Sequence, residues 1–309
     1  MKNVLTDPDL RLQFAGHETF PLRLLWLKKA FDAVAYHGAD KRTFQEQSAI
    51  AKFGVGKNMA LAIRHWAFAT GMLTDEEGTL SPTRLARMLF DDQSGLDPYL
   101  EDPSTLWLVH AALAGAPEQS TTFFFVFNIL NQAVFDREGL VEAIQELAKA
   151  RGARATAETV KRDVEVFLRS YSPRLADVGE DAAEPLLAEL ALIRESRLSG
   201  QFEFARGPKP NLQDGVFALV LKRFWKRWHA DAPTLSAEQA IYGAGSPGRV
   251  FKLDEDSVMA RLANIGATTN GAIIWTDTAG LRQVTLTRKL ETIDDTALIT
   301  ASYPHRRSA

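Results

Sequence analysis

Apolar residues recur every three to four positions along most of this 309-residue chain, and alternating apolar and polar positions are confined to short segments. In the first part, this pattern predicts helices over residues 21–35, 44–53 and 57–70, with a tight turn at 54–56 between the last two. Short apolar segments then flank residues 75–78, which is typical of a β-hairpin. The order indicates a helix-turn-helix followed by a hairpin wing.

The rest of the chain continues the same pattern. Residues 121–135 are too apolar for a surface and are expected to form a core helix. Further helices are predicted at residues 141–149, 155–171, 212–228, 236–239 and 257–265, and strands at 190–193, 201–205, 272–275 and 282–286. The predicted fold class is therefore mainly α with small β-hairpins, built as tandem winged-helix-like modules.

The length of the chain exceeds that of a usual single core, so we expect three domains. The first, residues 1–135, combines an N-terminal helix with a winged-helix DNA-binding domain. Residues 136–232 form a second helical or winged-helix-like domain. Residues 233–309 form a small α/β winged-helix-like domain.

Composition narrows the function classes. The chain contains no cysteine, which excludes disulfides, zinc–thiolate sites and thiol catalysis. Charges interrupt the first residues, and no apolar run reaches membrane-spanning length. We therefore expect a cytoplasmic protein that makes no membrane contact.

The net charge of −3 hides an uneven distribution. Residues 22–64 carry eight basic and three acidic side chains, whereas residues 75–102 carry eight acidic and two basic ones. A basic surface beside an acidic one suits a protein that binds a polyanion at one place and a metal or partner at the other. Because the predicted wing is acidic, a winged helix used only for protein contacts stays open as an alternative.

The candidate DNA-binding residues follow from these modules. Lys57, Asn58 and Arg64 lie in the first predicted recognition helix, where they offer contacts to phosphates and base edges. The remaining candidates are basic residues in or near the predicted modules, namely Arg23, Lys161, Arg162, Arg249 and Lys252. Arginine and tryptophan also alternate over residues 223–228, which suits either nucleic-acid stacking or a core helix with solvated cations.

The polar cluster at residues 14–21 is the most informative local motif. Thr19 is expected to cap a helix that has Pro21 in its first turn, which places His17 and Glu18 at the helix N-terminus. There an imidazole and a carboxylate are available as a catalytic acid and base. The alternative is that Glu18 only caps the helix and His17 is a hydrogen-bonded bystander.

A second motif, at residues 95–110, is acidic and bracketed by prolines. Asp97, Glu101 and Asp102 together offer oxygen ligands for a hard cation such as Mg²⁺. Aspartate before proline or serine also serves to shape turns and cap helices, so a structural role is the alternative.

Taken together, several motifs resemble the SspB-like family of bacterial proteins associated with DNA phosphorothioation. The resemblance covers nearly the whole chain and is carried by residues 16–20, 53–59, 97–107, 161–164 and 245–253. It implies a defence or modification system in which this protein recognises and nicks DNA, together with a cysteine desulfurase and an ATP-dependent sulfur-insertion enzyme. No established nuclease signature is visible, so a non-enzymatic DNA-binding adaptor or transcriptional regulator is the second expectation.

Overall fold

Helices dominate the structure, and strands occur only in three small antiparallel sheets. The computed structural model describes residues 4–36, 41–44, 53–172, 185–196, 200–278 and 280–303. Within these residues, no helix is both long and apolar enough to cross a membrane. The fold is thus helical with small antiparallel hairpins, as the sequence predicts.

The N-terminal part contains, in order, η1 (Val4–Thr6), α1 (Trp26–Ala35), η2 (Lys41–Phe44), α3 (Lys57–Ala69), β1 (Leu73–Glu76), β2 (Thr79–Pro82) and α4 (Arg84–Phe90). The predicted helix at 57–70 and the hairpin after it are confirmed, because β1 and β2 pair from Leu73 to Pro82. The predicted helix at 44–53 falls mainly on residues 45–52, which lie outside the described residues.

The predicted start of the first helix is wrong. Helix α1 begins at Trp26, directly after Leu25 with a φ of 63°. Thr19 has a φ of 69°, whereas an N-cap residue takes an extended conformation. Residues before α1 instead form two turns, closed by the hydrogen bonds from Phe20 N–H to the His17 carbonyl and from Trp26 N–H to the Arg23 carbonyl. Arg23 also forms a bridge to Pro185 far along the chain.

The middle part contains α5 (Pro103–Gly115), α6 (Thr121–Phe124), the π-helical turn η3 (Phe125–Ile129), β3 (Val134–Phe135), α7 (Arg137–Ala150), α8 (Ala157–Tyr171), η5 (Leu186–Leu190), β4 (Ile193–Glu195) and β5 (Phe202–Phe204). Its sheet has the order β3-β5-β4. The predicted continuous helix at 121–135 ends early. The Asn128 side chain donates to the Ala114 and Phe124 carbonyls, and Leu130 turns extended.

The C-terminal part contains α9 (Asp214–Trp228), β6 (Thr234–Ser236), α10 (Ala237–Tyr242), α11 (Pro247–Val250), α12 (Glu255–Ala263), α13 (Ile265–Thr268), β7 (Ile273–Thr278), β8 (Leu281–Leu286), η6 (Leu290–Thr292) and α14 (Asp295–Ala301). Its sheet has the order β6-β8-β7. A capping box between Ser236 and Gln239 starts α10. The predicted loop at 245–253 contains the short helix α11.

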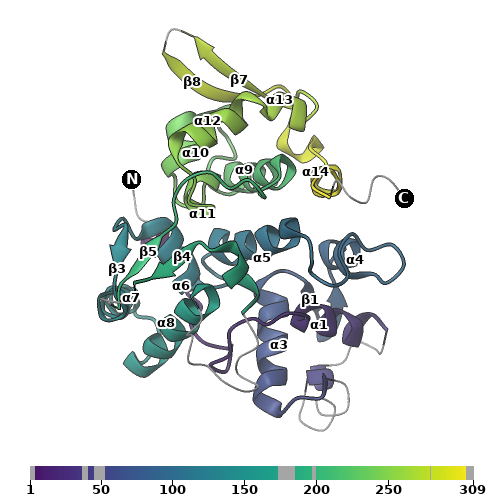
Figure 1. Cartoon of the computed structure of the whole chain (residues 1–309), viewed down its shortest axis with the longest axis vertical. Coiled ribbons are helices and arrows are strands. Elements are labelled where there is room, and N and C mark those ends of the chain that lie inside the picture. The colour runs from purple at the N-terminus through teal and green to yellow at the C-terminus, as the bar shows by residue number, and fades with distance from the viewer. Residues whose placement is uncertain are drawn as a thin grey trace.

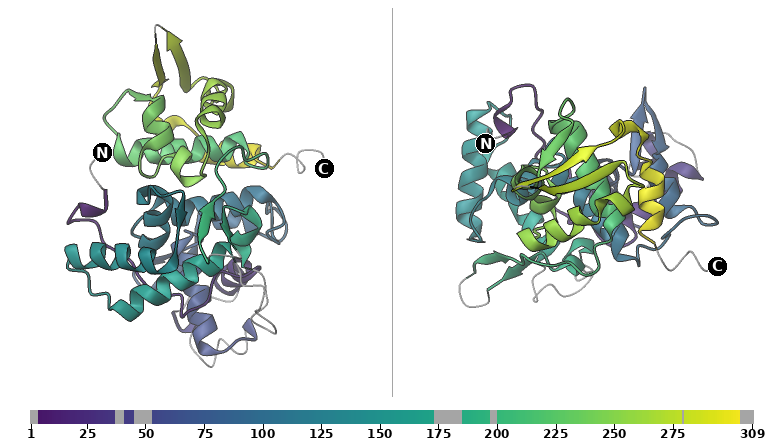
Figure 2. Two further views of the ribbon diagram at one scale, coloured as in Figure 1. Left: turned by 60° about the vertical axis from the view of Figure 1, so that its left-hand side comes forward. Right: turned by 90° about the horizontal axis from the view of Figure 1, so that it is seen from above.

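One buried apolar cluster joins all three parts. Helix α5 lies inside it and is apolar all round, which is typical of a fully buried helix. Figure 1 shows α9 and the rest of the C-terminal part above α5, with the β7–β8 hairpin extending away from the body. The left view in Figure 2 shows the same division between the C-terminal part and the elements below it.

Candidate functional site

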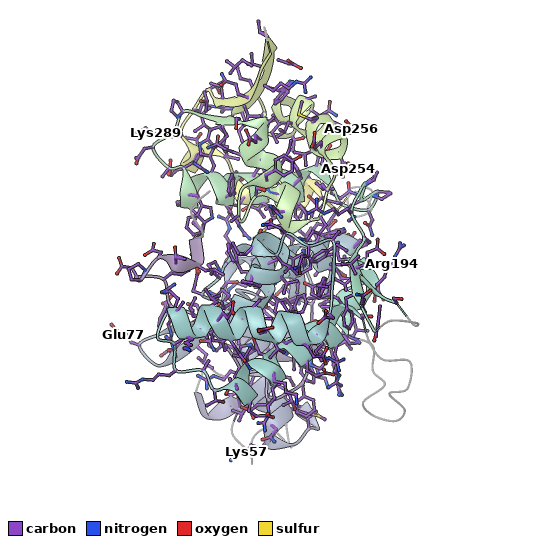
Figure 3. The ribbon with its side chains drawn as sticks, turned by 90° about the vertical axis from the view of Figure 1, so that its left-hand side faces the viewer. Lys57, Glu77, Arg194, Asp254, Asp256 and Lys289 are labelled. Carbon is purple, nitrogen blue, oxygen red and sulfur yellow. The ribbon has the colours of Figure 1, made fainter. Side chains whose placement is uncertain are left out.

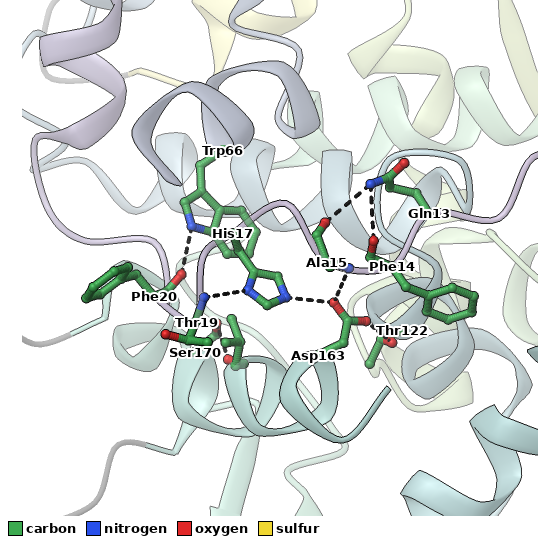
Figure 4. Close-up of polar contacts among 11 residues, drawn as sticks. Gln13, Phe14, Ala15, His17, Thr19, Phe20, Trp66, Thr122, Asp163 and Ser170 are labelled. Carbon is green, nitrogen blue, oxygen red and sulfur yellow. Dashed lines mark hydrogen bonds and ion pairs between the residues drawn. The ribbon is translucent and has the colours of Figure 1, made fainter. Parts of the chain in front are cut away.

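The signature at residues 14–20 crosses between α3 and α8 and is fixed by His17. The His17 Nε2 atom lies 2.8 Å from Asp163 Oδ1, and the Thr19 backbone N–H donates to His17 Nδ1 over 3.2 Å. Because Nδ1 accepts a hydrogen bond, the ring proton is on Nε2 and is donated to Asp163. His17 is only 4% exposed, so its ring is buried and holds the signature backbone in place (Figure 4).

Asp163, on α8, is the centre of this network. Besides His17, it accepts the Ala15 backbone N–H at Oδ1 over 3.1 Å and the Thr122 hydroxyl at Oδ2. Three donors offset the cost of burying the carboxylate. Asp163 therefore joins the signature to α6 and α8. It lies 146 residues after His17 in the sequence.

The signature backbone is strained. Ala15, Glu18 and Thr19 all have positive φ angles, of 64°, 49° and 69°. Gly16 has a φ of 102°, and a Cβ added there would lie 2.6 Å from His65 Nδ1. Only glycine permits this close approach. Such strain persists where the surroundings fix it, which is common at functional sites.

Helix α3 holds the other side of the signature. The His17 ring stacks on Trp66 at 6.1 Å between centroids, and the Trp66 indole N–H donates to the Phe20 carbonyl over 3.0 Å. His65 contacts the His17 ring edge-on at 5.9 Å. The signature is therefore clamped between α3 and α8.

A cleft of about 540 Å³, here called the N-terminal cleft, opens beside this clamp. Its polar wall combines both charges: Arg11, Glu18, Arg64, His65, Asp75 and Glu118. Glu18 is exposed and lines the cleft, whereas His17 lies behind it. Glu18 is not at a helix N-terminus, because no helix starts there.

His65 is a cleft residue that the sequence analysis missed. Burial lowers its pKa to about 4, the neighbouring His17 ring adds to the lowering, and Asp163 opposes it. The ring is therefore neutral near pH 7. The available signal was its position next to Arg64 in the predicted recognition helix.

The start of α3 is electropositive. Its N-cap is Gly56, which supplies no side-chain cap, and its first turn carries no acidic residue. Lys57 is exposed there (Figure 3), as is Asn58, and Arg64 lies along the helix over the Phe68 ring. Unsatisfied N–H groups, the helix dipole and Lys57 together suit a phosphate group.

The structure does not bring the other predicted DNA-binding residues to this surface. Arg23 is 8% exposed and lies over the Phe20 and Trp26 rings. Lys161 and Arg162 are exposed on α8, where Arg162 pairs with Glu158 over 3.0 Å.

Arg249 and Lys252 lie together elsewhere, at the contact between the middle and C-terminal parts. Arg249 donates to the Asn131 side chain over 3.0 Å. Lys252 is 1% exposed and donates to the Phe127 carbonyl over 2.7 Å. Burial holds the pKa of Lys252 well below its ordinary value, and nearby arginines add to the effect. A side chain in this position does not reach a phosphate in solvent.

The acidic motif at residues 95–110 hydrogen-bonds to nearby backbone N–H groups. Asp97 is 6% exposed and accepts the backbone N–H groups of Glu101 and Asp102 over 2.9 and 3.0 Å, together with the Thr105 hydroxyl. Asp102 caps α5 by accepting the Ser104 N–H over 2.8 Å. Backbone and hydroxyl donors thus engage the carboxylates of Asp97 and Asp102, and the Asp97, Glu101 and Asp102 side chains do not form a group placed to hold a metal. Over the whole described part of the chain, no group of three or more histidine or carboxylate side chains is placed to hold a metal.

The fold and this site define a class of protein: a helix-rich chain of repeated helix–hairpin units in which a strained polar segment borders a cleft of mixed charge. The chain belongs to the DUF4007 family, whose model is described as a protein of unknown function and matches residues 14–303.

Two solved structures are similar over almost the whole chain. A structure described as "Magnesium ion-bound SspB crystal structure" has a TM-score of 0.85 and 26% identity, and covers 100% of this chain and 92% of its own. The second, "SspB crystal structure", has a TM-score of 0.83 and 26% identity, and covers 99% and 92%. These similarities confirm the SspB-like resemblance. A search of curated proteins gave no match.

Proposed function

We propose that this chain is the DNA-binding component of a bacterial DNA phosphorothioation system and that it nicks DNA so that sulfur can be inserted. The observation that carries the proposal is the similarity to SspB over the full chain, at a TM-score of 0.85. A cysteine desulfurase and an ATP-dependent sulfur-insertion enzyme are its proposed partners, from the same resemblance.

The order of elements supports a DNA-binding fold. In the middle part β3, the helices α7 and α8, and the β4–β5 hairpin follow one another, with the sheet order β3-β5-β4. In the C-terminal part four helices, α10 to α13, lie between β6 and the β7–β8 hairpin, and the sheet order is β6-β8-β7. We infer from these orders that both parts are winged-helix-like modules. In the N-terminal part, α3 precedes the hairpin β1–β2 in the place of a recognition helix. We therefore infer that α3 faces DNA.

The N-terminal cleft continues this surface and is the proposed place of nicking. Arg64 lies on α3 and lines the cleft, so a strand held at Lys57 reaches Glu18 along one helix face. In the proposed step, Glu18 accepts a proton from a water molecule while the water oxygen bonds to phosphorus. The P–O bond to one sugar breaks, and the leaving sugar oxygen takes a proton from solvent water, so that a phosphomonoester and a hydroxyl group are formed. Arg64 balances the negative charge on the phosphate oxygens.

His17 has a supporting role in this proposal. Its two ring nitrogens are engaged by Asp163 and Thr19, and it does not line the cleft. It therefore positions the strained backbone that carries Glu18, and it does not itself transfer a proton.

Magnesium enters the proposal only through the similar structure that contains it. The ion usually binds one or two carboxylates and the substrate phosphates. Because the acidic motif does not fit it, we assign no residue to the ion in this chain.

The alternative is a DNA-binding adaptor without nicking activity. A supercoiled-plasmid assay with Mg²⁺ or with EDTA separates the two. Conversion to the open circle supports nicking. If conversion continues in EDTA, nicking needs no divalent metal ion. Plasmid binding without conversion supports the adaptor, and a protein that neither binds nor nicks the plasmid overturns both.

A further inference from the structure

A second cavity lies next to the N-terminal cleft, between α5 and α9. It has a volume of about 440 Å³ and is here called the interhelical pocket. Its α5 wall consists of small residues: Ala111, Ala112, Gly115 and Ala116. A Cβ added at Gly115 would meet no atom within 4 Å, so open space begins at the helix surface. The volume is within the range of small-molecule sites, about 300–1,000 Å³.

The opposite wall combines aromatic surface with positive charge. Phe224 and Trp228 line the pocket together with the cations Arg223, Lys226 and Arg227. Arg223 and Lys226 are exposed, and no carboxylate is among the described residues that line the pocket. This combination suits a compact ligand with a flat aromatic part and an anionic group.

One ion pair separates the two cavities. Arg227 of the interhelical pocket holds Glu118 of the N-terminal cleft through two parallel contacts, of 2.7 and 2.6 Å. A bound polymer that extends past this ion pair leaves one cavity and enters the other. Arg11 and Arg64 in the cleft and Arg223 and Lys226 beyond the pair provide cations along that path.

We propose that the interhelical pocket receives one unstacked nucleotide of a DNA strand whose neighbouring phosphates lie in the N-terminal cleft. This inference builds on the proposed function, since it places the substrate strand. The base lies against the small residues of α5 and the aromatic wall of α9, and Arg223 and Lys226 contact its phosphate. Extrusion of a base locally separates a strand from its duplex, which exposes the adjoining phosphodiester to the cleft.

The test compares two fluorescein-labelled octamers, one of thymidylate and one fully abasic, which carry the same phosphates. Wild-type protein is expected to bind the thymidylate strand about tenfold more tightly, because base stacking is lost in the abasic strand. Gly115→Leu fills the pocket and should reduce this ratio to below twofold while leaving the abasic affinity unchanged. Ala263→Leu, at an exposed small residue on α12, is the matched control.

Equal binding of the two octamers by the wild type overturns the inference. A ratio unchanged in Gly115→Leu, with an unchanged melting temperature, overturns it as well. If neither octamer binds although the protein binds duplex DNA, the inference is overturned and the proposed function stands. If the protein binds neither octamer nor duplex, the proposed function fails, and calorimetry with thymidine 5′-monophosphate decides about the pocket. If the wild type binds this nucleotide and Gly115→Leu does not, the pocket is a site for a free nucleotide. If the wild type does not bind it, the pocket is not a nucleotide site.

Discussion

The N-terminal and C-terminal parts each place a helix before a protruding hairpin, but they differ in charge at the helix start. Helix α3 begins with Lys57 and has no acid in its first turn, whereas α12 begins after the capping Asp254 with Glu255 and Asp256. Figure 3 shows Lys57 and these aspartates far apart on the molecule. An acidic helix start repels phosphate, so similar topology does not imply equal DNA binding.

The N-terminal and C-terminal parts also differ in backbone strain. The signature contains three non-glycine residues with positive φ, and a buried carboxylate holds it in place. The part of the chain that comprises α12, α13 and the β7–β8 hairpin, residues 254–278 and 280–289, is here called the α12 unit. There Asp254 caps α12 in an ordinary extended conformation. Positive φ angles are thus clustered in the signature, whereas the non-glycine residues Lys252 and Asn270 that flank α12 and α13 adopt them singly. Such clustering is common at functional segments.

The largest effect is expected from removing the carboxylate that supports the signature. Asp163→Ala leaves a buried imidazole N–H, a backbone N–H and a hydroxyl without their acceptor, so it should lower the free energy of unfolding by about 3–5 kcal/mol. Asp254→Ala removes only a cap and should cost about 1 kcal/mol. Urea denaturation measures both.

If Asp163→Ala does not fold, Asp163→Asn and Thr122→Val give smaller losses in the same direction. Equal losses for Asp163→Ala and Asp254→Ala would contradict the supporting role of Asp163.

The next effect concerns activity. Glu18→Gln should reduce nicking about a hundredfold, because the amide cannot accept the proton of water, and it should leave the melting temperature nearly unchanged. Glu291→Gln, at an exposed position in η6, is the control. Activity that falls only in proportion to the folded fraction of Glu18→Gln would restrict Glu18 to a structural role.

The dependence of folding stability on acid pH should also differ between histidines of the N-terminal and C-terminal parts. The folded pKa of His65 is about 4, below the ordinary 6.5, so between these values the unfolded chain binds more protons. Stability is therefore fully present above pH 6.5 and falls as the pH decreases towards 4, by about 1–3 kcal/mol for this residue.

His65→Gln should flatten that part of the stability curve measured by thermal unfolding. His229→Gln in the C-terminal part should change it less, since His229 is more exposed to solvent. Identical curves for the wild type and His65→Gln would show that the His65 ring gains no protons on unfolding.

The smallest effect is expected at the caps. Asp102→Ala should destabilise the protein by about 1 kcal/mol, like Asp254→Ala, because each removes one cap hydrogen bond. The loss should be the same with and without Mg²⁺. A wild-type melting temperature that rises with Mg²⁺ and no longer does so in Asp97→Asn would restore the metal site.

Sequence reasoning succeeded where local pattern decides the structure. Ile63 and Trp66 mark the buried face of α3, and Gly78 lies in the turn between the strands of a hairpin that was predicted in the right place. It failed at the start of α1, because the left-handed Leu25 and the bridge from Arg23 to Pro185 depend on tertiary contacts.

The candidate site was only partly predictable for the same reason. The signature and Glu18 were recognisable as chemistry, but the pairing of His17 with Asp163 joins residues that no local pattern connects. His65 enters the cleft because Gly16 approaches it closely. Such an approach is visible only in three dimensions.

The central claim is that DNA binds at α3, and the salt dependence of duplex binding tests it most directly. With fluorescence anisotropy between 50 and 200 mM salt, the double variant Lys57→Glu and Arg64→Glu should lose about a hundredfold in affinity, and its salt slope should fall by about two. The same reversals at Arg282 and Lys289, in the α12 unit, should change both values little. Unchanged affinity and slope in the α3 variant would contradict the account.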